Sequence, residues 1–400
     1  MNRAADNIRI LAAAAVEKAK SGHPGGAMGG ADFINVLYSE FLEYDPENPG
    51  WEARDRFFLD PGHMAPMLYS QLCLAGKYTL ADLQTLRQWG SVVPGHPERD
   101  IEHGIENTSG PLGQGHTFAV GAAIAAKWFN ARYGAIHNPT IYAFISDGGV
   151  QEEISQGAGR MAGFLGLDNL IMFYDSNEVQ LSTDCRDVTN EDVAAKYEAW
   201  HWFVQEIPGN DPDAIREALV RAKEEKNRPS LIIGHTTMGK GCVTADGQSF
   251  EGKCSTHGQP LSKSGASFEA TIKHLGGDPE NPFVIFPEVQ EMYDKRAAQL
   301  RETANQRYGK YYEWKQANPL AANEYETFMS GETPCIDWSE IVQKPGAATR
   351  NASATVLGYL AEHVGNMIVS SADLSNSDKT DGFLKKTHAL RRGDFTGQFL

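Results

Sequence analysis

The chain has 400 residues, 41% of them hydrophobic and 22% charged, which is typical of a globular protein and excludes a disordered one. Its length suggests two or three domains. The charges sum to −16, from 36 basic and 52 acidic residues, so general binding to nucleic acid or to an anionic membrane surface is disfavoured. No apolar stretch approaches the roughly 20 residues that span a bilayer. The five cysteines show no Cys-x-x-Cys spacing, which favours free thiols in a reducing cytoplasm over a zinc site.

Apolar periodicity and turn residues predict a succession of helices and short strands. In chain order we predict helices at 3–20 and about 27–40, strands at 57–59 and 140–145, a helix at 152–165, a strand at 169–174, a helix at 213–226, a strand at 230–234, helices at 287–315 and 347–364, and a strand at 366–370. The Gly-, Ser- and Lys-rich stretch from about 245 to 285 is predicted to form long loops.

The middle of the chain predicts the fold class. A strand, a helix and a second strand follow one another between residues 140 and 174, which is the pattern of a βαβ unit with a parallel strand pair. The strands are apolar throughout, as expected for strands that are covered on both faces. We therefore predict an α/β fold, in which helices cover both faces of a parallel sheet.

The most informative spacing joins Ser146-Asp147-Gly148-Gly149 to Asn177, 30 residues after Asp147. Each of these polar residues follows a predicted strand, so both should lie at the same edge of a parallel sheet, where ligands bind. Carboxylate and amide oxygens suit Mg²⁺ or Ca²⁺, and Gly148 and Gly149 would let a phosphate approach the backbone where the next helix begins. An ordinary Asp-Gly turn is the alternative, but the strand–helix–strand context favours a metal–diphosphate site.

The segment from Asp147 to Asn177 resembles the thiamine diphosphate motif, in which Asn follows Gly-Asp-Gly at a similar distance. Further blocks, in the same order as in transketolases, extend this resemblance over the whole chain. These blocks are Ser21-Gly22-His23-Pro24-Gly25, Gly62-His63, Pro94-Gly95-His96-Pro97-Glu98, Gly110-Pro111-Leu112-Gly113-Gln114-Gly115, His257-Gly258 and Ser371-Ala372-Asp373-Leu374. The chain thus resembles the transketolase family.

The resemblance implies a diphosphate-binding domain over residues 1–317, a linker over 318–345 and a truncated beginning of the pyrimidine-binding domain, an incomplete second α/β domain, over 346–400. It implies thiamine diphosphate and Mg²⁺ (or Ca²⁺) as cofactors. The implied reaction, part of the cytoplasmic pentose phosphate pathway, transfers a two-carbon ketol unit from a ketose phosphate to an aldose phosphate. The implied partners are sugar phosphates and either a second copy, in a homodimer, or a chain that carries the rest of the pyrimidine domain.

The resemblance also implies roles for individual residues. Three would bind the metal: Asp147, Asn177 and the carbonyl of Val179. The cofactor would be lined by His63, Gly110, Pro111, Leu112, Gly148, Asn177 and His257, with Glu152 in an acidic network between two active sites and Asp373 near the cofactor and the subunit interface. The reacting carbonyl would be surrounded by His23, His96 and His257, whose ordinary pKa near neutrality suits proton transfer. The sugar phosphate would be held by Arg350 and Ser377.

Some of these residues have ordinary alternatives, because a lone histidine is usually structural and Arg350 could form a surface ion pair. The sequence also departs from the family. Ser146 replaces the first glycine of the motif, so the strand end must avoid a positive φ. Gly157 stands where the family often has a second acidic residue. In the family, the glutamate that activates the cofactor follows the position of Leu400, and we therefore expect this chain alone to be inactive.

Other readings of the sequence stay open. One is a related ketol transferase, such as dihydroxyacetone synthase or deoxyxylulose phosphate synthase. The Gly110–Gly115 and Pro94–Glu98 blocks favour transketolase over the latter enzyme. Another is a non-catalytic subunit that binds thiamine diphosphate and serves as a partner.

Overall fold

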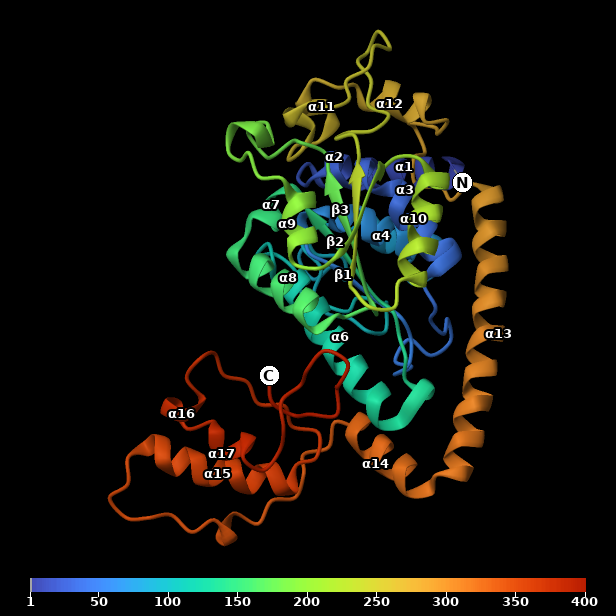
Figure 1. Ribbon diagram of the computed structural model, residues 1–400. Coiled ribbons are helices and arrows are strands. Elements are labelled where there is room, and N and C mark those ends of the chain that lie inside the picture. The colour runs from blue at the N-terminus through green and yellow to red at the C-terminus, as the bar shows by residue number, and fades with distance from the viewer. Residues whose placement is uncertain (1) are drawn as a thin grey trace. The chain divides into compact units, whose positions relative to one another are not determined.

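The computed structural model describes residues 2–400, which form two compact units (Figure 1). The first, here called the sheet unit, consists of the residues up to Ala123 together with Pro139–Gln306. The second, the C-terminal unit, consists of Ile124–Asn138 and Arg307–Leu400. The predicted domain limits at 317 and 346 stay a prediction.

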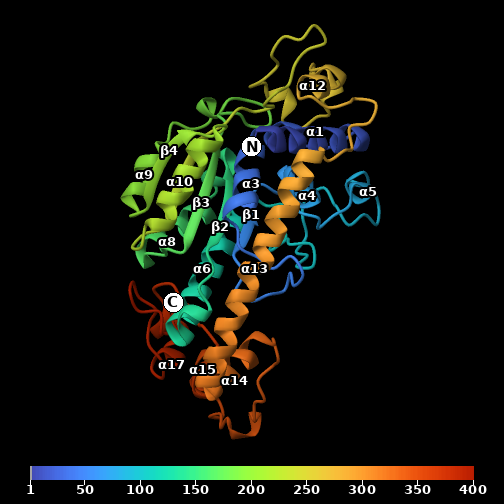
Figure 2. The same ribbon diagram turned by 90° about the vertical axis from the view of Figure 1, so that its right-hand side faces the viewer.

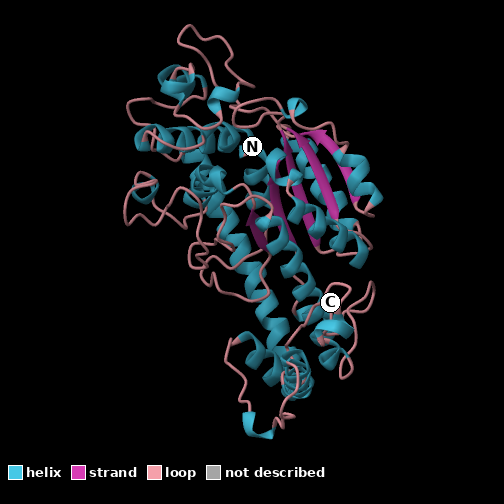
Figure 3. Cartoon of the chain, turned by 90° about the vertical axis from the view of Figure 1, so that its left-hand side faces the viewer, coloured by secondary structure: helices cyan, strands magenta, loops and turns pink. Residues whose placement is uncertain are grey.

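A five-stranded parallel sheet lies at the centre of the sheet unit, with its strands in the order β1-β2-β3-β5-β4. The strands are β1 (Arg56–Leu59), β2 (Ile141–Ser146), β3 (Leu170–Ser176), β4 (Phe203–Pro208) and β5 (Ser230–His235). Ser146 pairs with Asp175 and Ser176 pairs with His235, so the carboxyl ends of β2, β3 and β5 lie at one level. Figure 3 shows the strands side by side. The predicted parallel sheet is confirmed, and β4 is an addition to the predicted strands.

Helices cover both faces of the sheet, as predicted. Figure 1 shows α7, α8 and α9 on one side and α3, α4 and α10 on the other, and Figure 2 looks onto the latter face. The helices of the sheet unit are α1 (Asn2–Ala19), α2 (Pro24–Gly29), α3 (Ala31–Val36), α4 (Ala65–Leu74), α5 (Leu80–Leu83), α7 (Asp147–Gln151), α8 (Glu153–Leu165), α9 (Val193–Ala199), α10 (Pro212–Glu224), α11 (Leu261–Ser264) and α12 (Phe268–His274). The division between the units falls inside α6 (Gln114–Tyr133) and α13 (Pro287–Ala317). Among residues 2–400 no helix combines the length and the apolar character that a membrane span needs.

The core of the sheet unit is built on stacked aromatic rings. Phe33 of α3 lies 4.1 Å, centroid to centroid, from Phe173 of β3, and Phe173 lies 5.5 Å from Phe144 of β2. All three side chains are fully buried, and burial of each contributes about 1.5–3 kcal/mol to folding. This stack fixes α3, and the α2 segment before it, against the strands whose ends carry the predicted site.

The C-terminal unit is helical. Its helices are α14 (Pro319–Met329), which lies within the predicted linker, α15 (Thr349–His363), α16 (Ser375–Asp378) and α17 (Asp381–Leu384). The strand predicted at 366–370 is wrong: within the described residues Val369 forms only an isolated bridge with Phe399. An apolar run needs a neighbouring strand over several residues, and here the 389–399 segment offers single bridges instead.

Two further predictions need correction. The single helix predicted over 27–40 is divided into α2, α3 and a π-helical turn at Leu37–Phe41, with a break at Gly30, where Gly30 lies against Met67 and Phe144. The predicted loops from 245 to 285 contain α11 and α12, and Ser267 caps α12 by accepting a hydrogen bond from the backbone N–H of Ala270.

Helix α8 packs so closely on the segment before β4 that one of its positions accepts only glycine. A Cβ at Gly163 would lie 1.7 Å from the carbonyl oxygen of Trp200. Gly157, six residues earlier in α8, has no neighbouring heavy atom in the space where its Cβ would lie. The same substitution at these two positions therefore separates packing from helix propensity.

We expect Gly163→Ala to destabilise the protein by about 2–3 kcal/mol, because the helix must shift away from the Trp200 carbonyl. Gly157→Ala, the control in the same helix, should stabilise it by about 0.5–1 kcal/mol, because alanine favours the helix. The free energy of unfolding of each variant, measured in urea, checks this. Equal effects at the two positions would contradict the packing.

His116, in the first turn of α6, is a fully buried histidine, and neither of its ring nitrogens has a hydrogen-bond partner among the described residues. The rings of Tyr197 and Trp202 lie about it, at 6.4 and 6.2 Å between centroids. Burial lowers the pKa of His116 to about 4. The fold therefore holds this imidazole neutral.

We expect His116 to make the protein sensitive to acid. The unfolded chain takes up a proton on this residue as the pH falls through 6.5, whereas the folded chain resists until about pH 4. The unfolding free energy should thus fall by up to roughly 3 kcal/mol over this range because of His116 alone. His116→Phe should reduce that loss, as measured by urea unfolding at several pH values, while His274→Phe at an exposed position should not. A pH dependence unchanged by His116→Phe would refute the prediction.

Candidate functional site

The carboxyl ends of four strands of the sheet unit meet at one cavity of about 490 Å³. His63 follows β1, and Asp147 follows β2. Asn177 follows β3, and Met238 lies on the segment after β5. The cavity is therefore a product of the parallel sheet, which brings residues far apart in the sequence to the same edge.

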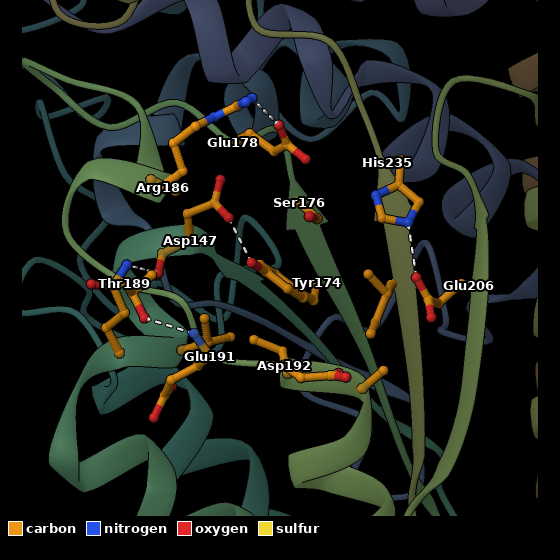
Figure 4. A pocket seen from close by; sticks show the side chains of 16 residues that line it. Asp147, Tyr174, Ser176, Glu178, Arg186, Thr189, Glu191, Asp192, Glu206 and His235 are labelled. Carbon is orange, nitrogen blue, oxygen red and sulfur yellow. Dashed lines mark hydrogen bonds and ion pairs between the residues drawn. The ribbon is translucent and has the colours of Figure 1, made fainter.

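Asp147 and Asn177 lie next to each other at this edge, as predicted. The backbone N–H of Asn177 donates a hydrogen bond of 3.2 Å to one carboxylate oxygen of Asp147. The hydroxyl of Tyr174 donates one of 2.6 Å to the other oxygen, as Figure 4 shows. The amide oxygen of Asn177 accepts from the backbone N–H of Val179 at 3.0 Å. Burial raises the pKa of Asp147, and the hydrogen bonds from Tyr174 and Asn177 oppose this rise.

Asp175, the second-to-last residue of β3, is a second buried carboxyl group beside this pair. It accepts hydrogen bonds from the side-chain amide of Asn177 at 3.1 Å and from the hydroxyl of Thr236. Burial, together with the nearby charge of Asp147, raises the pKa of Asp175 to about 7, although the hydrogen bonds from Thr236 and Asn177 oppose the rise. Asp175 thus orients the amide of Asn177, so that the amide oxygen is held on the side of Val179.

Ser146 ends β2 with φ −110° and ψ 173°, so the strand end avoids a positive φ as the replacement of glycine requires. Gly148 lines the cavity, and a Cβ there would lie 2.9 Å from Cδ1 of Leu112, which lines the cavity beside it. Gly149 does not line it. A Cβ at Gly149 would lie 2.5 Å from a carboxylate oxygen of Asp60, so this glycine serves the packing of α7 against Asp60 instead of the phosphate approach that we expected.

Asp60 holds the loop that forms the adjoining wall. Its carboxylate follows β1 and accepts hydrogen bonds from the backbone N–H groups of Gly113 (3.1 Å), Gly115 (2.8 Å) and His116 (3.3 Å). These groups open α6, whose first N–H groups have no partner within the helix. Gly110 and Leu112, just before them, line the cavity. Asp60 therefore ties the position of this loop to the end of β1.

Four histidines gather in the cavity, from four separate loops: His23, His63, His96 and His257. The ring of His63 lies 5.1 Å from that of His23 and 5.2 Å from that of His257, between centroids. His23 and His257 are 5.8 Å apart. The backbone brings these loops into close contact, because a Cβ at Gly25 would lie only 2.7 Å from the carbonyl oxygen of Thr256.

The environment of this cluster favours neutral imidazoles. Burial lowers the pKa of His23 to about 4, aided by His257, Arg87 and His96. Burial also lowers the pKa of His63 well below its ordinary value, with repulsion from the three other histidines. The pKa values of His96 and His257 are lowered by burial too, although a hydrogen bond with the backbone of Gln180 opposes the shift of His257. Neutral rings can donate and accept hydrogen bonds, which suits proton transfer at hydroxyl and carbonyl groups.

A second cavity, of about 530 Å³, adjoins the first, and Asp147 lines both. Figure 4 shows its polar lining, which includes the carboxylates of Glu178, Glu191, Asp192 and Glu206. Arg186 and His235 also line it, and each pairs with one of these glutamates. So many carboxylates repel a phosphate group. The four-histidine cavity is therefore the better site for an anionic cofactor.

The structure brings most of the predicted residues to that cavity. Ten of them line it: His23, His63, His96, Gly110, Leu112, Asp147, Gly148, Asn177, Val179 and His257. Pro111 and Glu152 do not; both are exposed, and Glu152 is the residue before α8. Arg350, Asp373 and Ser377 belong to the C-terminal unit, where a guanidinium N–H of Arg350 donates to the carbonyl oxygen of Ser377 at 3.4 Å.

Sequence reasoning missed several residues of this region. Asp175, Gln180 and Met238 line the cavity, and Arg87 contacts His23. Asp175 gave a signal that could have been used, since a carboxylate that ends an apolar strand two residues before Asn177 is unusual. The placement of Arg87 and Met238 depends on the tertiary fold and leaves no such trace.

In comparisons with known proteins, the chain matches transketolases. Residues 1–334 match a family model described as transketolase, thiamine diphosphate binding domain. The chain is 38% identical over 392 residues to transketolase 2 of Escherichia coli, in an alignment that covers 94% of this chain and 57% of the relative. It is 37% identical to the chloroplastic transketolase-1 of Arabidopsis thaliana, with 95% of this chain and 52% of the relative covered.

Solved structures agree. Transketolase from Leishmania mexicana matches with a TM-score of 0.93 at 31% identity, over 100% of this chain and 59% of that one. A Pichia stipitis transketolase in complex with sedoheptulose-7-phosphate matches with a TM-score of 0.91 at 32% identity, over 100% of this chain and 60% of that one. The chain thus spans little more than half the length of these relatives, and over that span its sequence and its fold show that it belongs to the transketolase family.

Proposed function

We propose that the four-histidine cavity binds thiamine diphosphate and a divalent cation, and that the chain takes part in the transfer of a two-carbon ketol unit from a ketose phosphate to an aldose phosphate. The observation that carries the proposal is the contact between Asp147 and Asn177 at the ends of β2 and β3, in a cavity of a size common for cofactors. The description of the matching family model names the same cofactor.

The residues present fit a cation, Mg²⁺ or Ca²⁺. Asp147, the amide oxygen of Asn177 and the carbonyl of Val179 are the hard oxygen ligands that these ions prefer. Burial raises the pKa of both Asp147 and Asp175, and the charge of Asp147 adds to the rise at Asp175. A bound cation would favour the ionised form of both groups. Gly148, which lines the cavity without a side chain, supports a place for the diphosphate, with His63, Gly110, Leu112 and His257 about the cofactor. We propose that Pro111, between Gly110 and Leu112 in the same loop, lies near the cofactor as well.

When bound, the cofactor supplies through its thiazolium ring the nucleophilic carbon that ketol transfer requires. The chain's own residues position the sugar and move protons. Neutral His23, His96 and His257 would donate to and accept from the hydroxyl and carbonyl groups of the donor and the acceptor. Arg350 and Ser377, which are in contact through a hydrogen bond, would hold the sugar phosphate.

We assign residues 1–317 to the diphosphate-binding domain and 346–400 to the beginning of the pyrimidine-binding domain, with a linker between them, as the resemblance implies. The chain spans 57% of the length of the E. coli relative. We propose that it acts together with a partner, either a second copy or a chain that carries the rest of the pyrimidine domain, with Glu152 and Asp373 near that partner. Free thiols at all five cysteines support a cytoplasmic location, where the pentose phosphate pathway would be its setting.

Isothermal titration calorimetry tests the cofactor site. We expect the chain to bind thiamine diphosphate in the presence of Mg²⁺. Asp147→Asn should weaken this binding by at least about 100-fold, because loss of a residue that only hydrogen-bonds to a metal ligand already costs up to about that much. Chelation of the metal should weaken binding to the wild type but not further to the variant. Glu206→Gln, which removes a carboxylate of the acidic cavity, is the matched control and should bind normally. Equal binding by Asp147→Asn would disprove the metal site.

The outer face of α8 supports the proposed pairing. Ile154, Met161 and Phe164 recur at helical spacing on this face and are 47%, 38% and 70% exposed. Three large apolar side chains in one stripe are typical of a face that another protein surface covers. The stripe begins two residues after Glu152, the residue proposed to lie near the partner.

We expect Phe164→Glu to prevent pairing without loss of folding, because the side chain is exposed and a charge there would be desolvated on association. Sedimentation velocity of the chain, alone and with a candidate pyrimidine-domain chain, measures the assembly. Ketol transfer from a ketose phosphate should appear only in the assembled form. Val220→Glu, at an exposed apolar position of α10, is the control. Turnover by the monomeric chain, or assembly that survives Phe164→Glu, would count against this arrangement.

A further inference from the structure

A guanidinium group stands directly behind one of the four histidines. Arg87, which follows α5, places one guanidinium nitrogen 3.5 Å from Nδ1 of His23 and donates from another to the hydroxyl of Ser21 at 2.9 Å. Within residues 2–400 no carboxylate forms an ion pair with Arg87, and burial lowers the pKa of this group. A half-buried guanidinium without an acidic partner is costly, so its position calls for an explanation.

The backbone holds this guanidinium in place at the expense of strain. Arg87 has φ +63°, a left-handed conformation that is uncommon for a residue with a long side chain. The turn that imposes it is closed by a hydrogen bond from the N–H of Arg87 to the carbonyl of Val93 at 3.2 Å. The side chain then passes over Gly95, where a Cβ would lie 2.8 Å from Nε of Arg87. Strain of this kind persists at sites where it serves the function.

An arginine side chain can only donate hydrogen bonds, so the ring nitrogen that faces it must be an acceptor. On His23 that nitrogen is Nδ1, and the single proton of the neutral ring must then reside on Nε2. The Nε2 edge faces away from Arg87, toward the segment of Gly258: a Cβ there would lie 3.6 Å from Nε2. Nε2 has no hydrogen-bond partner among the described residues, although His23 lines the cavity.

We propose that Arg87 is a positioning residue that holds His23 as the neutral tautomer with its proton on Nε2, so that His23 enters the cavity as a hydrogen-bond donor. The charged and titratable groups that face His23 are Arg87, His63, His96 and His257. Arg87 is the permanent cation among them, and it has the direct contact with Nδ1. The role of that donor toward a sugar hydroxyl or carbonyl rests on the proposed function, whereas the tautomer is a property of the chain itself.

The experiment is nitrogen NMR of the full chain labelled with ¹⁵N-histidine, without cofactor or substrate. The resonances of His23 are those that His23→Gln removes. We expect a protonated Nε2 and an unprotonated Nδ1 at pH 7. Arg87→Met should raise the pKa of His23 by roughly one unit, because a neighbouring positive charge is lost, and should allow the other tautomer. Arg87→Lys, which keeps a cationic donor, should retain the wild-type tautomer.

Arg99→Met, at an exposed arginine outside the cavity, is the control and should leave both readouts unchanged. A wild-type His23 with its proton on Nδ1 would overturn the proposal, as would a tautomer and pKa that Arg87→Met does not alter. If Arg87→Met fails to fold, as judged by circular dichroism, the wild type and Arg87→Lys decide by their tautomers. Because no cofactor is present, a failure of thiamine diphosphate binding would not affect this result.

Discussion

Parallel pairing of β2 with β3 is the constraint on which the candidate site depends. The register that sets Ser146 opposite Asp175 places the residues after both strands at one height, where Asn177 can donate its backbone N–H to Asp147. Neither residue would have this neighbour in an antiparallel sheet, whose successive strands end at opposite edges. The buried aromatic stack of Phe33, Phe144 and Phe173 holds the pair in that register.

The same edge sets two electrostatic environments side by side. On one side of Asp147, four histidines whose pKa values are lowered by burial line a cavity together with the buried carboxyl group of Asp175, whose pKa is raised to about 7. On the other side, carboxylates dominate. In a chain with a net charge of −16, the four-histidine cavity repels an anion less than the neighbouring cavity, which is lined by four further carboxylates. Among residues 2–400, Asp147 alone lines both cavities.

Much of this arrangement could be predicted from the sequence, because its strongest signals are local. The apolar runs of β2, β3 and β5 and the acid and amide after them indicated a parallel sheet with a site at its edge. β4 escaped prediction because Gln205 and Glu206 interrupt its apolar pattern, as edge strands permit, and because Pro208 ends it. The helix break at Gly30 and the position of Arg87 depend on contacts with distant residues, which no local pattern records.

Asp147 lies between the four-histidine cavity and the acidic cavity and lines both. The acidic cavity is also lined by Tyr174, whose hydroxyl donates a hydrogen bond to the Asp147 carboxylate, and by Cys185, on the loop after β3. Because Cys185 contacts Asp147, a movement of that loop would displace the Asp147 carboxylate, which also lines the four-histidine cavity. The binding of the proposed cation at Asp147 would then depend on the conformation of the loop that carries Cys185.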